Sequence, residues 1–200
     1  MQLAAQEAAK KANDILLLSP TGSGKTLAFL LPVVKSLNAD KGGVQTLILV
    51  PSRELGLQIE QVFKQMNTGF KVNCCYGGHS TKTEKNNLSE PPAVLIGTPG
   101  RIAYHIRQNS FDTNCVNTLV LDEFDKALEL GFKEEMSFII GELKKLRKRL
   151  FVTDLTGSMS PYTKQLGGWF KEKIRNNPDI NILFFNDGDG KPDSLKSDGT

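Results

Sequence analysis

The sequence predicts an α/β fold, with helices on both faces of a mostly parallel sheet of about seven strands. Short runs rich in Val, Ile and Leu recur along the 200 residues, and the clearer runs are continuously apolar rather than alternating. Continuous apolar runs are typical of strands that are buried on both faces, as in a parallel sheet. Stretches with helical spacing lie between most of these runs, and such alternation indicates the α/β class.

One strand is expected at each apolar run. The runs are "DILLL", "TLILV", "KVNCC", "AVLIG", "TLVLD", "RLFVT" and "NILFF", at residues 14–18, 46–50, 71–75, 93–97, 118–122, 149–153 and 181–185. Ligands bind at the carboxyl ends of the strands in sheets of this kind, so the residues after each strand are the first place to look for a site.

The clearest helices are expected at residues 1–14, which are rich in alanine, and at 53–66 and 132–146. The last two each carry one apolar stripe at helical spacing. The basic run at 142–150 is interpreted as the solvated end of the third helix, with Leu143 and Leu146 facing inward. Residues 1–185 are expected to form one domain. Residues 186–200 are rich in Gly, Asp, Ser and Lys and predict a flexible linker or tail.

The composition excludes several classes of protein. No apolar run is long enough to span a membrane and no signal peptide opens the chain, so we expect a cytoplasmic protein without a membrane partner. The net charge of +3 is too weak by itself to indicate nucleic acid. Cys74, Cys75 and Cys115 lack metal-ligand spacing and are expected to be core or near-core thiols. His79 and His105 likewise have no metal-ligand partner in spacing, so surface or core roles are expected.

The segment "SPTGSGKT", Ser19 to Thr26, follows the first expected strand and precedes an amphipathic stretch. Glycines at 22 and 24 allow several backbone N–H groups to point at one anion, and Lys25 adds a charge for the outer phosphates. The Thr26 hydroxyl can ligate magnesium. The alternative is a glycine turn with a chance Gly-Lys-Thr. The strand before and the helix after favour a phosphate-binding loop.

Two carboxylates, Asp122 and Glu123, stand at the end of the expected strand 118–122. Such a pair suits nucleotide hydrolysis, because one carboxylate can hold magnesium while the next orients or deprotonates the attacking water. The alternative is an acidic helix N-terminus, which helix dipoles favour in any case. A phosphate loop upstream in the same sheet favours the catalytic interpretation.

These segments resemble, in order, the motifs of the N-terminal RecA-like domain of DEAD-box RNA helicases. The similarity covers roughly residues 2–152. It rests on Gln2, on "SPTGSGKT", on "PSREL" at 51–55, on "GG" at 77–78, on "TPGR" at 98–101, on "DEFD" at 122–125 and on "GF" at 131–132.

The resemblance implies a RecA-like P-loop NTPase domain of an ATP-dependent RNA helicase, using ATP and Mg²⁺ to remodel short RNA duplexes or RNA–protein complexes. The implied catalytic residues are Lys25, Asp122 and Glu123, and the implied metal ligands are Thr26 and Asp122. The implied nucleotide contacts are Gln2, Thr21, Gly22, Ser23, Gly24, Lys25 and Thr26. The implied contacts with the single-stranded RNA backbone are Pro51, Arg53, Gly78, Thr98, Gly100 and Arg101. Contacts to phosphate and ribose imply little sequence preference.

Besides Ser52 for the usual Thr and Phe124 for the usual Ala, the chain departs from the family pattern in two larger ways. Thr153, Asp154 and Leu155 stand about where the family has Ser-Ala-Thr, the motif that couples hydrolysis to unwinding. A second RecA-like domain, which supplies arginine fingers, is expected to be absent from this chain, so the isolated domain should be nearly inactive. Two alternatives therefore stay open: a non-catalytic RNA- or protein-binding module with the helicase fold, and a DNA-directed helicase. The expected partners are RNA and the second domain, and the oligomeric state is not predicted.

Overall fold

The computed structural model describes residues 2–19, 24–78, 80–154 and 180–184. Strands and helices alternate along the chain, as the sequence predicts. The elements are α1 (Gln2–Lys11), β1 (Asp14–Ser19), α2 (Lys25–Ser36), β2 (Thr46–Leu49), α3 (Arg53–Gln65), β3 (Val72–Cys75), α4 (Thr81–Ser89), β4 (Val94–Gly97), α5 (Pro99–Arg107), η1 (Thr113–Cys115), β5 (Thr118–Asp122), α6 (Phe124–Glu129), α7 (Lys133–Glu142), β6 (Lys148–Asp154) and β7 (Ile180–Phe184).

The strands form one seven-stranded sheet in the order β3-β4-β2-β5-β6-β1-β7. Every strand pair in the described part of the chain is parallel. The fold class and the seven strand positions predicted from the sequence are therefore confirmed. Because all strands run in one direction, their carboxyl ends share one edge of the sheet.

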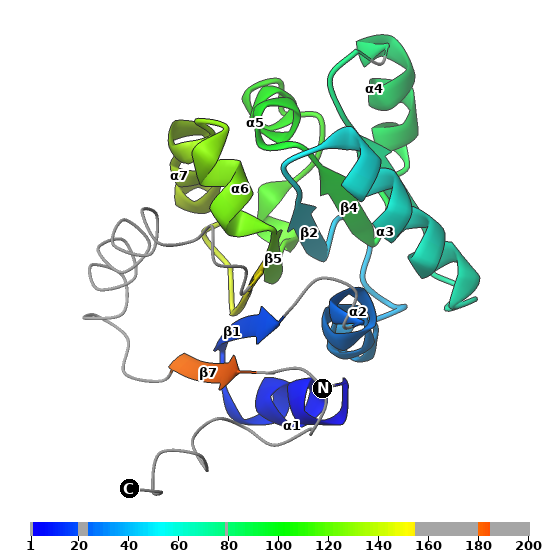
Figure 1. Cartoon of the computed structure of the whole chain (residues 1–200). Coiled ribbons are helices and arrows are strands. Elements are labelled where there is room, and N and C mark those ends of the chain that lie inside the picture. The colour runs from blue at the N-terminus through cyan, green and yellow to red at the C-terminus, as the bar shows by residue number, and fades with distance from the viewer. Residues whose placement is uncertain (1, 20–23, 79, 155–179, 185–200) are drawn as a thin grey trace, which may run out of the picture.

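Helices cover both faces of the sheet, as Figure 1 shows for α1 and α2 on one side and α5, α6 and α7 on the other. Side chains of β2 explain the continuous apolar runs. Leu47 and Leu49 pack in the cluster with α5, α6 and α7, whereas Ile48 packs in the cluster with α1, α2 and α3. Successive residues of a strand point to opposite faces, so a strand covered on both sides has to be apolar throughout.

The helix expected at 132–146 is shorter than predicted. It forms α7 and ends at Glu142, with Leu143 as its C-cap. The interpretation of residues 142–150 as a helix end is therefore wrong, because Lys148 already belongs to β6. The N–H groups of Arg147 and Lys148 donate to the Asn117 carbonyl at 2.8 and 3.0 Å, and this bonding to the residue before β5 draws the chain out of the helix.

Two close contacts fix neighbouring strands. Arg149 on β6 binds the buried Asp14 on β1, with its Nε 2.6 Å from Oδ1 and its Nη2 2.5 Å from Oδ2. Gly97 ends β4 so close to β3 that a Cβ atom there would lie 2.6 Å from the Cys75 carbonyl oxygen. Among the helices that the structure describes, none is both long and apolar enough to cross a membrane.

Candidate functional site

The sequence-predicted site residues lie along the carboxyl edge of the sheet, and the strand order divides them into two groups. The residues expected to contact RNA follow β2, β3 and β4, which are neighbours at one end of the sheet. The residues expected to bind nucleotide, apart from Gln2 on α1, stand at or after the ends of β1 and β5, which flank β6. The topology thus places the RNA group on three neighbouring strands and the nucleotide group on the two strands either side of β6, all at one edge of the sheet.

The loop after β1 leads directly into α2. Gly24 has a φ of +83° and is the residue before the helix, so the left-handed backbone that ends the loop suits glycine. Lys25 and Thr26 open α2, where the backbone N–H groups and the positive end of the helix dipole favour an anion. Three predicted contacts, Thr21, Gly22 and Ser23, lie outside the described residues.

Gln2 on α1 lies beside this loop. Its Nε2 atom is 3.4 Å from the point where a Cβ on Gly24 would stand. Gln2 is exposed, so its amide is accessible next to the start of α2. The fold therefore brings together two segments that the sequence only places in order.

Asp122 ends β5 and is only 4% exposed. Burial, and next the neighbouring Glu123 carboxylate, raise the pKa of Asp122 to about 7, while the charge of Lys25 acts in the opposite direction. A cation bound beside Asp122 would stabilise its ionised form, because the positive charge offsets both the burial and the repulsion from Glu123. The donor set of Asp122 and the Thr26 hydroxyl therefore fits a hard, oxygen-seeking ion such as Mg²⁺.

Glu123 has an unusual backbone and a partly exposed side chain. Its φ of +47° lies in the left-handed region, which non-glycine residues seldom adopt and which recurs at functional sites. This turn separates the end of β5 from α6 and lets the Glu123 N–H donate to Asp122 Oδ1 at 3.0 Å. The Glu123 carboxylate pairs with Lys126 at 3.2 Å and remains 26% exposed, so it is accessible at the sheet edge.

The strand between β1 and β5 contributes one contact of its own. Thr153 on β6 donates its hydroxyl to Asp125 Oδ1 at 2.7 Å, and both residues are buried. Thr153 is the first residue of the segment that departs from the family pattern, and it ties the end of β6 to α6. Leu155 lies outside the described residues.

The segment after β2 opens α3. Ser52 is the N-cap of α3, and its side-chain hydroxyl oxygen accepts from the Leu55 N–H at 3.3 Å. Pro51 is buried, and Arg53 is exposed as the first residue of the helix. The Arg53 guanidinium carbon lies 4.8 Å from the centre of the Tyr76 ring.

The segments after β3 and β4 carry the other residues expected to contact RNA. Gly78 has a φ of +82° in the turn after β3. Thr98 is the N-cap of α5, but its side chain makes no capping hydrogen bond, in contrast to Ser52. Pro99 is the first helical residue, a position that suits proline because its φ is already helical and its missing N–H would have no partner within the helix. Gly100 and Arg101 follow in the first turn of α5.

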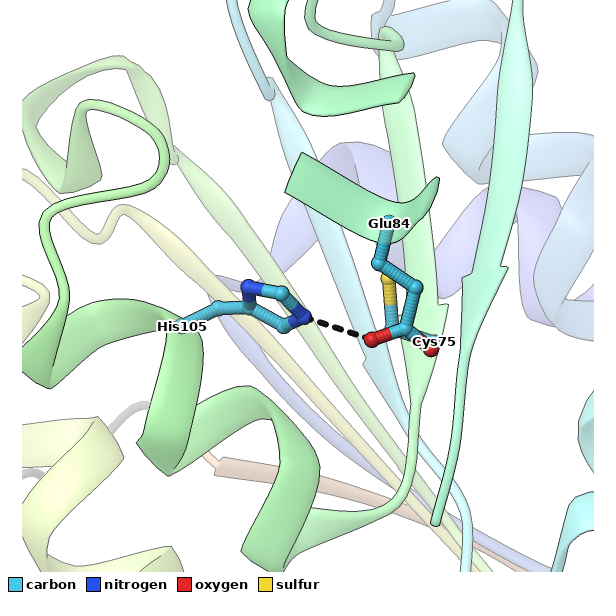
Figure 2. Close-up of side chains that lie close together, drawn as sticks. All are labelled: Cys75, Glu84 and His105. Carbon is cyan, nitrogen blue, oxygen red and sulfur yellow. Dashed lines mark hydrogen bonds and ion pairs between the residues drawn. The ribbon is translucent and has the colours of Figure 1, made fainter. Parts of the chain in front are cut away.

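A buried cluster of side chains contacts Arg101 and was not predicted from the sequence. Glu84 on α4 binds Arg101 Nε at 2.6 Å. It also binds His105 Nε2 at 2.8 Å, the contact that is drawn in Figure 2. The Cys75 thiol lies beside them, and ligand atoms of Cys75, Glu84 and His105 all fall within 4.8 Å of one another. No spacing rule could have found this cluster, because Glu84 is separated from Arg101 and His105 by 17 and 21 residues.

The chain is similar to helicases in sequence and in structure. The profile of DEAD/DEAH box helicases matches residues 1–160. The "ATP-dependent rRNA helicase RRP3" of Encephalitozoon cuniculi is 42% identical over 142 residues, which are 70% of this chain and 36% of that protein. The "ATP-dependent RNA helicase CshA" of Limosilactobacillus reuteri is 32% identical over 162 residues, which are 80% of this chain and 32% of that protein.

A solved structure has the same fold. The crystal structure of a DEAD box protein from the hyperthermophile Methanococcus jannaschii matches with a TM-score of 0.76 and 25% identity, over 88% of this chain and 46% of that chain. This chain thus spans about a third of the length of the two relatives above. The match over residues 1–160, together with the RecA-like sheet, places the chain in the DEAD/DEAH box helicase family.

Proposed function

We propose that this chain is the ATP-binding domain of an ATP-dependent RNA helicase that remodels short RNA duplexes or RNA–protein complexes. The observation that supports this most directly is that the α2 N-terminus and the buried Asp122 stand at one edge of the sheet, near enough for the charge of Lys25 to lower the pKa of Asp122. One element offers N–H groups and a lysine for phosphates, and the other offers a carboxylate that needs a cation. Family membership and the names of the relatives support the same conclusion.

In this proposal each nucleotide-site residue has one role. Gln2 contacts the adenine, while Gly24 and Lys25, with Thr21, Gly22 and Ser23 of the same loop, hold the phosphates. Thr26 and Asp122 hold Mg²⁺, which supplies charge neutralisation on the phosphate oxygens when it is bound. Glu123 orients the attacking water and accepts its proton, which its partial exposure at the sheet edge permits.

The RNA contacts lie on the neighbouring strands. Pro51, Arg53, Gly78, Thr98, Gly100 and Arg101 contact the backbone of a single strand. The two arginines supply charge for phosphates, and the helix starts and glycine turns supply N–H groups. Such contacts read no bases, so the proposal includes weak sequence preference. A second RecA-like domain, which the length of the relatives leaves room for, completes the site, and the whole acts in the cytoplasm.

ATP hydrolysis by the full-length protein, measured with and without single-stranded RNA, tests this function. We expect RNA to stimulate turnover and Glu123→Gln to abolish it while nucleotide binding persists. Glu129→Gln is the matched control, because Glu129 is exposed at the end of the same helix, α6. Turnover that is absent or independent of RNA would contradict the enzymatic proposal.

The same experiment separates the two alternatives. Nucleotide or RNA binding without any turnover would indicate a non-catalytic binding module, for which the departure at 153–155 is the supporting observation. Single-stranded DNA of the same sequence is the second arm. Equal or stronger stimulation by DNA would indicate a DNA-directed helicase.

A further inference from the structure

Helix α4 is polar along almost its whole length, yet it buries one carboxylate. Its residues are "TKTEKNNLS", and the buried ones are Glu84 and Leu88. Glu84 is only 1% exposed. A buried carboxylate is costly unless it is paired and hydrogen-bonded, so its partners show what the burial achieves.

Both oxygens of Glu84 are engaged by loops that the proposed function assigns to RNA. Oε1 accepts from the Tyr76 N–H at 3.2 Å, which holds the turn that contains Gly78. Oε2 accepts from Arg101 Nε at 2.6 Å, which holds the side chain at the start of α5. One carboxylate therefore joins the segments that follow β3 and β4.

His105 completes the shell around Glu84, one turn further along α5. Its Nε2 lies 2.8 Å from Glu84 Oε2, and its Nδ1 lies 3.1 Å from Ser110 Oγ. An ionised carboxylate can only accept, so Nε2–H is the donor. Burial lowers the pKa of His105 and favours the neutral imidazole, in which Nδ1 accepts from the Ser110 hydroxyl. This neutral tautomer satisfies the imidazole and leaves Arg101 as the countercharge of Glu84.

The arrangement favours an ion pair over a metal site, although Cys75 lies in the cluster (Figure 2). Burial raises the pKa of the Cys75 thiol to about 12, and Glu84 adds to this effect. A cysteine binds a metal ion as the thiolate, and this environment disfavours the thiolate form of Cys75. The Arg101 guanidinium already occupies the carboxylate that a metal ion would need.

The contacts continue to the segment after β2 through an aromatic ring. Tyr76, whose N–H is held by Glu84, carries its ring 4.8 Å below the Arg53 guanidinium carbon. A cation over a ring face is attracted by the ring quadrupole, and the flat guanidinium is held in a defined orientation. Arg53, Tyr76, Glu84 and Arg101 thus form a continuous series of contacts across three strand ends.

We infer that Glu84 and Tyr76 are positioning residues that hold Arg53, Arg101 and the Gly78 turn as one preformed RNA-contacting surface. The inference rests on the proposed function, because it takes these loops to contact RNA. In this proposal neither Glu84 nor Tyr76 contacts the RNA strand itself. They fix two long arginine side chains before binding, and so remove an ordering cost from each RNA contact.

The test compares ATP hydrolysis by full-length variants as a function of single-stranded RNA concentration, with RNA binding measured separately in the presence of a non-hydrolysable ATP analogue. In Glu84→Gln the amide keeps an acceptor for Tyr76 but can set an N–H₂ donor against the Arg101 and His105 donors. We expect the RNA concentration for half-maximal stimulation of turnover to rise on the order of tenfold, with little change in turnover at saturating RNA. Glu90→Gln, an exposed residue just after α4, is the control and should change neither.

A double-mutant cycle separates positioning from a general structural role. If Glu84 acts through Arg101, the effect of Glu84→Gln should largely disappear in an Arg101→Ala background. Additive effects would overturn the inference, as would unchanged RNA affinity in Glu84→Gln. Stoichiometric Zn²⁺ binding that is lost in Glu84→Gln would also overturn it, by indicating a metal site.

A second variant covers the case in which Glu84→Gln fails to fold. Tyr76→Leu removes the ring below Arg53 but keeps the backbone N–H that Glu84 accepts from. We expect weaker RNA binding that is not additive with Arg53→Ala. If the wild-type protein binds no RNA, the proposed function itself fails. If it binds RNA and neither variant weakens binding, only the positioning role fails.

Discussion

His105 is fully buried on α5, and its environment makes the stability of the chain sensitive to pH. Burial lowers the pKa of the imidazole, against the opposing effect of the hydrogen bond to Glu84. Arg101 on α5 and Lys85 on α4 add to the lowering. Below about pH 6.5, His105 therefore binds a proton more readily in the unfolded chain than in the folded chain. The contribution of His105 to folding stability is present above that pH and is lost as the pH falls.

From about pH 7.5 to about pH 5.5 the raised pKa of Asp122 acts in the opposite direction, so the effect of His105 is isolated by comparison with His105→Gln. This variant removes the titrating imidazole but keeps a donor for Glu84. We expect the thermal midpoint of the wild-type chain, relative to that of His105→Gln, to fall as the pH is lowered through this range. The measurement is thermal unfolding followed by circular dichroism at several pH values. An unchanged pH dependence in His105→Gln would show that other groups cause it.

Residues differ in how far the sequence could predict where they lie. The positions of Lys25 and Thr26 at a helix start and of the acidic pair at a strand end could be predicted, because short segments beside apolar runs indicate them. Glu84 could not, because it lies in a helix that is otherwise polar and its partners are distant in sequence. The role of its charge is visible only in the folded chain, where Glu84 on α4 contacts Arg101 and His105 on α5.

At the scale of elements, the strands were predictable and one helix end was not. Each strand is apolar throughout because both faces of the sheet are covered, and that pattern is local. Leu143 and Leu146 continue the helical spacing beyond Glu142, so a local pattern extends α7 too far. What ends the helix is the bonding of Arg147 and Lys148 to the Asn117 carbonyl, a pairing about thirty residues away that no window of sequence reveals.

The surroundings of Gly97 and Gly141 predict opposite effects of a Gly→Ala substitution on stability. Gly97→Ala places a Cβ atom 2.6 Å from the Cys75 carbonyl oxygen, so the strands must separate, and we expect a loss of about 2 kcal/mol of unfolding free energy. Gly141→Ala in α7 meets nothing within 4 Å, and should be neutral or stabilising by up to about 1 kcal/mol. Urea denaturation of both variants measures this, and an equal effect would contradict the close approach at Gly97.

At the scale of the whole molecule, one RecA-like sheet supplies only one side of the proposed ATP site. We expect the isolated chain to bind nucleotide, to show scarcely any turnover and to unwind no duplex. An arginine finger from a second domain is worth roughly 10³–10⁵ in rate, and its loss should reduce turnover by about that factor. Steady-state phosphate release by the chain, compared with the full-length protein at saturating RNA, is the measurement. Equal, RNA-stimulated rates would show that one domain suffices.

The strand order also has a consequence for synthesis on the ribosome. Within the described part of this chain β1 is translated first of the strands, and its neighbours in the sheet, β6 and β7, are translated last. At typical elongation rates β1 waits roughly seven to twenty-seven seconds for its first neighbour. Meanwhile the apolar Ile15 and Leu17, which the finished fold buries almost completely, have no sheet to join. We therefore expect a ribosome-associated chaperone to bind the segment that contains β1 during this interval.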